Sequence, residues 1–164
     1  MASSNDINLG EKEEWTTHYS EKGAEFEVAH GEVKLLVASW NMGNAKATNL
    51  DVLIPNQGAG YDMIVLGCQE STYKAKKGIT TLFMDASVAE LRDSVEAAIG
   101  DEFYRAHYVK QVQMQLLIYA RKEMRSRISN LEYSTENTGF FGVLPNKGGI
   151  LGSMTVDGTS LAFV

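Results

Sequence analysis

The chain has 164 residues and a mass of 18.0 kDa, the size of about one domain. Its apolar share of 44% and charged share of 22% are typical of a soluble globular protein, and no run approaches the roughly 18 apolar residues of a membrane-spanning helix. The net charge of −6 argues against wholesale binding to nucleic acid or to an acidic membrane. The N-terminus also lacks the apolar core of a signal peptide, so we expect a cytoplasmic protein.

Residues 1–32 form a polar, acidic lead-in segment with no clear apolar period. His18 and His30 lie in it without other metal-ligating residues nearby, which favours surface positions for both. We therefore place the start of the folded domain at residue 33 and its extent at 33–164.

Two apolar runs predict buried strands over residues 33–39 and 62–67. Trp40–Asn44 follows the first strand and Gly67–Glu70 closes the second. If these strands are neighbours in one sheet, Asn41 and Glu70 leave it on the same side and can converge. An amide oxygen and a carboxylate are the hard ligands that Mg²⁺ takes while it keeps several waters. The alternative is ordinary punctuation, because Asn-Gly turns and acidic residues often follow strands.

A loop of about twenty residues joins the two strands, longer than compact domains usually need. Within it, residues 49–54 can pack locally and Pro55–Gly58 indicates a turn. The single cysteine, Cys68, follows an apolar strand with nothing beside it to lower its pKa. We interpret it as a small buried residue rather than a nucleophile.

The next segment predicts a helix, followed by strands. Ser87 and Glu90 form a capping box, Gly100 is placed to end the helix, and apolar residues recur between them at helical spacing. Beyond it the period becomes two. The pattern predicts strands over residues 103–111, 113–120, 128–133, 150–155 and 159–164, the last two joined by a turn at Asp157-Gly158.

Basic residues gather in two places. Each cluster is either a solvated loop or a surface that faces an anionic head group. The first comprises Lys74, Lys76 and Lys77, and the second Arg121, Lys122, Arg125 and Arg127. His107, in a predicted strand, has no partner in view and favours a structural role.

The phrase Asn146–Gly149 combines a lysine with paired glycines. Glycines let the backbone approach a ligand closely, and a lysine beside them suits a phosphate. The alternative is an ordinary hairpin turn.

Taken together, Trp40–Asn44, Asp62–Glu70 and Asn146–Gly149 resemble successive signatures of the inositol polyphosphate 5-phosphatases, within the endonuclease/exonuclease/phosphatase superfamily. The order and approximate spacing match as well. The resemblance implies that Asn41 and Glu70 belong to a Mg²⁺ site and act in catalysis, and that Asn146 and Lys147 contact substrate phosphates. It also implies an α/β fold, the N-terminal half of a DNase I-like two-sheet β-sandwich flanked by helices.

The implied reaction is Mg²⁺-dependent removal of the 5-phosphate from an inositol polyphosphate or a phosphoinositide lipid. In the family a catalytic histidine and further site residues follow later in the domain, and this chain's three histidines do not match that motif. We therefore expect the N-terminal part of a larger catalytic domain, with its C-terminal half missing and little or no activity alone. Residues 143–145 depart from the usual pattern of the family.

Other interpretations stay open. A noncatalytic phosphoinositide-binding or regulatory module would keep the basic loops without turnover. A nuclease of the same superfamily would share Asn41 and Glu70, but Asn146-Lys147 and the acidic total favour inositol phosphates or phosphoinositides over nucleic acid as partners. We also expect that the protein could dock peripherally on membranes. A product with no folded state is the last alternative.

Overall fold

The computed structural model describes residues 31–72, 82–138 and 148–164. Their strands form a four-stranded sheet in the order β1-β2-β4-β3 and a three-stranded sheet in the order β5-β6-β7. The strands are β1 (Leu35–Asn41), β2 (Met63–Gln69), β3 (Phe103–Gln111), β4 (Met114–Arg121), β5 (Ile128–Asn137), β6 (Gly148–Val156) and β7 (Thr159–Phe163). Helices α1 (Leu50–Leu53) and α2 (Leu82–Ile99) and the 3₁₀ turns η1 (Pro55–Gly58) and η2 (Lys122–Ser126) connect them.

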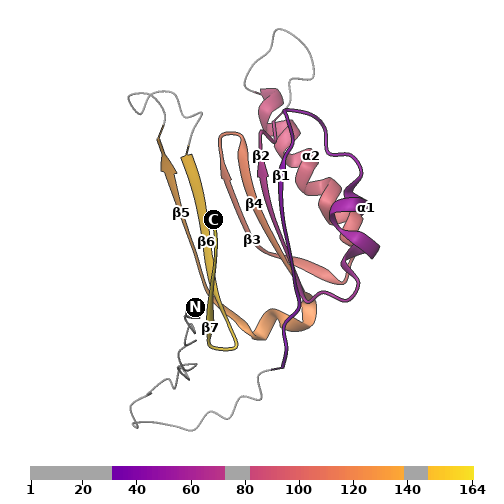
Figure 1. Cartoon of the computed structure of the whole chain (residues 1–164), viewed down its shortest axis with the longest axis vertical. Coiled ribbons are helices and arrows are strands. Elements are labelled where there is room, and N and C mark those ends of the chain that lie inside the picture. Colours follow the sequence, from indigo (N-terminus) through magenta and orange to yellow (C-terminus); the bar gives the residue numbers. More distant parts are fainter. Residues whose placement is uncertain (1–30, 73–81, 139–147) are drawn as a thin grey trace, which may run out of the picture.

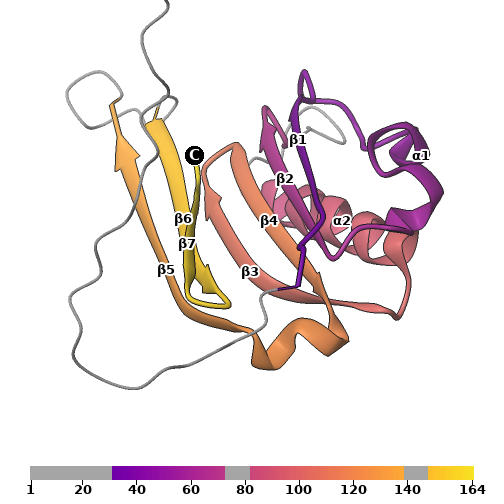
Figure 2. The ribbon, with the colours of Figure 1, turned by 60° about the horizontal axis from the view of Figure 1, so that its bottom comes forward.

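The two sheets face each other, and α1 and α2 lie on the outer face of the four-stranded sheet (Figures 1 and 2). Each face of the four-stranded sheet therefore has its own core. Leu66, Leu91 and Leu117 pack between the sheet and α2, whereas Val65, Ile118 and Met154 pack between the two sheets. The predicted α/β class and two-sheet sandwich are confirmed.

The first two strands pair in parallel, with Leu35 opposite Met63 and Asn41 opposite Gln69. Residues Met63–Leu66 of β2 are all buried, which explains their unbroken apolar sequence. In β1, by contrast, Val37, Ser39 and Asn41 are exposed and the residues between them are half-buried. The side chain of Val37 is 59% exposed. Strand β1 is thus an edge strand, while β2 is central.

The flank between the edges β1 and β7 is apolar and open among the described residues. Val37, Ala162 and Phe163 line a cleft there, and neither strand carries a charged residue. Edges β3 and β5 on the opposite flank carry charged residues and a bulge each. Uncharged edges without bulges invite pairing with another chain. A partner-dependent or aggregation-prone flank is therefore our prediction for this side.

The boundaries of the predicted helix and strands agree with the structure to within two residues except at two places. Helix α2 begins at Leu82, so Ser87 lies inside it and the predicted capping box is wrong. Leu82, Met84 and Ala86 are good helix formers that extend the helix toward its N-terminus. Strand β5 runs to Asn137 rather than Tyr133, because it pairs with the start of β6 at Gly148. No described helix combines the length and apolar character that crossing a membrane requires.

The predicted turn at Asp157-Gly158 is confirmed between β6 and β7. Both residues have positive φ, +46° and +80°, as a type I′ hairpin turn requires. Asp157 also accepts a hydrogen bond of 2.5 Å from Arg127, which ties this turn to the end of η2. The turn at Pro55–Gly58 is confirmed as η1, where Gly58 at φ +78° is buried against Ile64 and Phe103.

Replacing Leu117, which is fully buried against the helix layer, should lower the free energy of unfolding. Leu117→Ala removes buried carbons and leaves a cavity, so we expect a loss of about 2–5 kcal/mol. Urea unfolding followed by circular dichroism measures it. The matched control is Val52→Ala, whose side chain is 80% exposed and should change stability by less than about 0.5 kcal/mol. Equal effects of the two changes would contradict the described core.

Candidate metal centre at the end of the β1–β2 pair

Asn41 and Glu70 meet where the parallel strands β1 and β2 end. The side-chain amide of Asn41 donates to Glu70 Oε1 at 3.3 Å, although 29 residues separate them. Asn41 Oδ1 in turn accepts the backbone N–H of Gly43 at 2.9 Å, which fixes the amide's orientation. Both side chains are exposed. The predicted convergence of these two residues is confirmed as a contact.

Asn44 joins this pair, and the sequence interpretation did not assign it a role. Its side-chain amide donates to Glu70 Oε2 at 3.2 Å, and its backbone N–H donates to the carbonyl of Glu70 at 2.9 Å. Each carboxylate oxygen of Glu70 therefore accepts a hydrogen bond from one asparagine. Asn44 has φ +57°, which asparagine tolerates better than most residues, and this Gly-Asn turn was the available sequence signal.

The oxygen atoms at this point suit a hard divalent cation. Glu70 supplies a full negative charge, and its carboxylate has lone pairs beyond the two hydrogen bonds that it accepts. The oxygen of Asn41 keeps one lone pair beside its bond to Gly43, but the amide N–H group rather than this oxygen faces Glu70, so the amide has to turn over for both residues to share one cation. Mg²⁺ commonly takes one or two protein carboxylates and fills its shell with water, which an exposed site allows. Among the residues that the structure describes, no group of three or more His, Cys, Asp or Glu side chains gathers into a metal cluster.

A cleft of about 630 Å³ runs from this edge between the two sheets. It is lined by Ser39 and Gln69 from the ends of β1 and β2 and by Gly148 and Gly149 at the start of β6. The last two residues of the predicted Asn146–Gly149 phrase thus face the strand ends that carry Asn41 and Glu70. Asn146 and Lys147 themselves lie outside the described residues, so their predicted contact with substrate phosphates stays a prediction.

The two glycines of that phrase have different surroundings. A Cβ atom on Gly148 would clash with the carbonyl oxygen of Glu136 on β5, so the close strand pairing requires glycine there. Gly149 has nothing within 4 Å of its Cβ position. The first glycine is therefore explained by packing, and only Gly149 leaves open space for the approach of a ligand.

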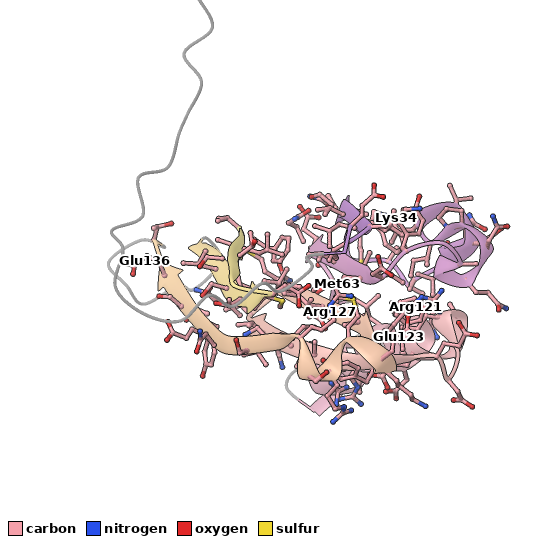
Figure 3. All side chains as sticks on the ribbon, turned by 90° about the horizontal axis from the view of Figure 1, so that it is seen from below. Lys34, Met63, Arg121, Glu123, Arg127 and Glu136 are labelled. Carbon is pink, nitrogen blue, oxygen red and sulfur yellow. The ribbon has the colours of Figure 1, made fainter. Side chains whose placement is uncertain are left out.

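The second basic cluster lies at the far end of the sheet from Glu70, since η2 precedes β5 at the bottom of the view whereas β2 ends at the top (Figure 1). Arg121 forms an ion pair with Glu102 at 2.5 Å, and Arg127 forms one with Asp157. Figure 3 shows Arg121 and Arg127 together at this lower end. These two arginines stabilise the local fold. The first cluster, Lys74, Lys76 and Lys77, lies outside the described residues.

The single cysteine and His107 occupy structural positions. Cys68 is 2% exposed in the core beneath α2, and burial raises the pKa of its thiol to about 11. His107 packs between the sheets, with its ring centroid 5.9 Å from that of Tyr133 and its carbon Cδ2 near Gly152. The predicted burial of Cys68 is confirmed.

Comparison with known proteins identifies the class of protein. The sequence profile described as Endonuclease/Exonuclease/phosphatase family 2 matches residues 38–164. The chain belongs to this family. The matched region contains both strand ends of the candidate site and all of the two sheets except the first three residues of β1.

The curated relatives that the chain resembles are 5-phosphatases of phosphoinositides and inositol polyphosphates. The chain is 27% identical over 144 residues to phosphatidylinositol 3,4,5-trisphosphate 5-phosphatase 2A of Danio rerio, an alignment covering 80% of this chain and 11% of the relative. It is 30% identical over 122 residues to inositol polyphosphate 5-phosphatase K of Mus musculus, covering 70% of this chain and 25% of the relative. The chain thus spans between about a tenth and a quarter of these proteins.

Solved structures share the fold. The inositol polyphosphate 5-phosphatase domain of SpSynaptojanin, crystallised with inositol (1,4)-bisphosphate and calcium, has a TM-score of 0.55 at 24% identity, covering 79% of this chain and 38% of that one. Cimex nitrophorin in its ferrous NO complex has a TM-score of 0.57 at 18% identity, covering 79% and 44%. Because one fold serves such different proteins, function has to be argued from the site.

The buried thiol gives a pH prediction. Since the pKa of Cys68 is raised from 9.0 to about 11, the unfolded chain loses this proton first. The thiol's contribution to stability is present in full below about pH 9 and is lost as the pH rises toward 11, by up to about 1.4 kcal/mol per pH unit. Urea unfolding between pH 8 and 10.5 should show a steeper decline for the native sequence than for Cys68→Ala. Equal slopes would mean that Cys68 is not buried as described.

Proposed function

We propose that this chain provides the metal-binding part of a phosphatase that removes the 5-phosphate of inositol polyphosphates or phosphoinositides with the help of Mg²⁺. The contact between Asn41, Asn44 and the carboxylate of Glu70 carries the proposal. The family membership and the 5-phosphatase relatives support the substrate class.

The residues present have distinct tasks in this proposal. Glu70 supplies the charge that attracts the cation, and Asn41 adds a neutral oxygen once its amide turns over and its bond to Glu70 Oε1 gives way to the cation. Asn44 holds the second carboxylate oxygen, so that Glu70 keeps one orientation. A Mg²⁺ ion held here supplies Lewis-acid polarisation of a phosphoryl oxygen.

Substrate phosphates in this proposal occupy the cleft between the strand ends and Gly149. Asn146 and Lys147 precede β6 in the chain and would contact those phosphates, as the family resemblance implies. An ammonium group and an amide N–H offset the negative charge that develops on a transferring phosphoryl group. The catalytic histidine that the resemblance expects would come from outside these residues, so the chain alone should bind substrate with little turnover.

The test is binding of inositol 1,4,5-trisphosphate by calorimetry, with Mg²⁺ and then with EDTA. We expect Mg²⁺-dependent binding that Glu70→Gln weakens at least about tenfold, because the variant removes the charge that holds the cation. Inositol 1,4-bisphosphate, which lacks the 5-phosphate, should bind more weakly. Glu132→Gln on β5 is the matched control, since this exposed carboxylate lies in the other sheet.

Phosphate release measured in the same samples should stay near background. Binding that is independent of Mg²⁺ and of Glu70 would instead identify a noncatalytic binding module. Absence of binding by folded protein would contradict the proposed substrate class. Mg²⁺-dependent release lost in Glu70→Gln would support the activity and overturn the expectation that the chain is inactive alone.

A further inference from the structure

The loop that carries Glu70 is held in a strained conformation. Glu70 has φ +48°, a left-handed value that a non-glycine residue adopts at a cost of about 1–3 kcal/mol. Across from it, Val112 in the β3–β4 turn has φ +50°, which is rarer still for a β-branched residue. The two strained positions are adjacent in space, because the backbone N–H of Ser71 donates to the carbonyl of Gln113 at 2.9 Å.

A buried chain of polar side chains lies behind this contact. Tyr108 donates its hydroxyl to Gln115 Oε1 at 3.1 Å, and Gln115 Nε2 donates to Ser71 Oγ at 2.9 Å. The Ser71 hydroxyl then donates to the carbonyl of Gln113 at 2.9 Å. Ser71 and Gln115 are each 1% exposed. Such a chain is rigid when every member is satisfied, and costly when one is removed.

The same turn reaches the site through a side chain. Gln113 Nε2 donates to Asn44 Oδ1 at 3.2 Å, which leaves the Asn44 amide to donate to Glu70 Oε2. This bond selects the orientation of the Asn44 amide, because Oδ1 must face Gln113 and the N–H group must face the carboxylate. The β3–β4 hairpin therefore reaches Glu70 by two routes, one through its bonds to Ser71 and one through its bond to Asn44.

We propose that Ser71, Gln113 and Gln115 are positioning residues, which together form a brace from the β3–β4 hairpin that sets the carboxylate of Glu70 for the cation. The brace deepens the proposed function and rests on it for the identity of the cation. Its geometry does not depend on the cation, since every bond in it joins two protein groups. Residues behind a metal ligand typically change metal affinity 10–100-fold when they are removed.

The first test is amide hydrogen exchange measured residue by residue by NMR, without metal. Gln113→Ala removes only the side-chain bond to Asn44, and Ser71→Ala removes the hydroxyl that links Gln115 to Gln113. We expect both variants to speed exchange of the backbone N–H of Asn44, which donates to the carbonyl of Glu70, about fivefold or more. A factor of this size corresponds to the loss of one hydrogen bond. Exchange of the Leu117 amide in the core should stay unchanged.

The second test measures the affinity for Mn²⁺, using the electron paramagnetic resonance signal of free Mn²⁺ as the readout. Gln113→Ala and Ser71→Ala should weaken binding about 10–100-fold, and Glu70→Gln should weaken it at least as much. Asn130→Ala is the control, since it removes a comparable amide bond of 3.2 Å to Thr155 in the other sheet. Thermal unfolding without metal shows whether each variant remains folded.

The outcomes separate the two proposals. Unchanged Asn44 exchange in Gln113→Ala, a substitution at a partly exposed side chain, overturns the brace whatever the metal result. Native Mn²⁺ affinity in both brace variants, with binding lost in Glu70→Gln, overturns the brace and keeps the metal site. If the native chain does not bind Mn²⁺, or Glu70→Gln binds as well as it does, the proposed metal site fails and the exchange data still decide the brace.

Discussion

The parallel pairing of β1 with β2 is the constraint on which the rest of the structure depends. It places Asn41 opposite Gln69, so that the residue after β2 lands beside the residue that ends β1. A shift of register by one residue would turn Asn41 and the half-buried side chains of β1 to the other face. The alternation of half-buried and exposed side chains in β1 fixes that register and hence the site, because the run of β2 is apolar on both faces and does not select a register by itself.

The candidate metal site carries a single negative charge and depends on the orientation of the Glu70 carboxylate. Glu70 is the only carboxylate of the Asn41–Asn44–Glu70 group, and its two oxygens are held by two different amides from the turn after β1. Because the fold is shared with proteins as different as a nitrophorin, this group and the cleft beside it carry the functional argument. The cleft opens on the same flank as the uncharged edges β1 and β7.

Local patterns predicted most elements of the fold, because burial and turn chemistry leave local marks. Strand β2 is recognisable as an unbroken apolar run, and Asp157-Gly158 marks the turn between β6 and β7. The predicted start of α2 at Ser87 was wrong, because the pattern Ser-x-x-Glu also occurs inside helices. The end of β5 was missed because pairing with Gly148, a long-range contact, decides it.

The site was predicted in part for the same reason. Asn41 and Glu70 each follow an apolar run, so their meeting needed only one assumption about neighbouring strands. The contact of Gln113 with Asn44 joins residues 69 positions apart, and nothing near either residue indicates it. Ser71 and Gln115 give a weak signal as polar residues beside apolar runs, but only the packed structure shows that they are buried and bonded to each other.

The most direct measurement of the central claim is anomalous diffraction from crystals grown with Mn²⁺, recorded at the manganese edge. The account predicts an anomalous peak beside Glu70 that disappears in crystals of Glu70→Gln. Asn41 Oδ1 should be the second protein ligand, with its amide turned over from the orientation that donates to Glu70 Oε1. An anomalous peak at other described residues but not beside Glu70, or no peak at all in well-ordered crystals, would contradict the account.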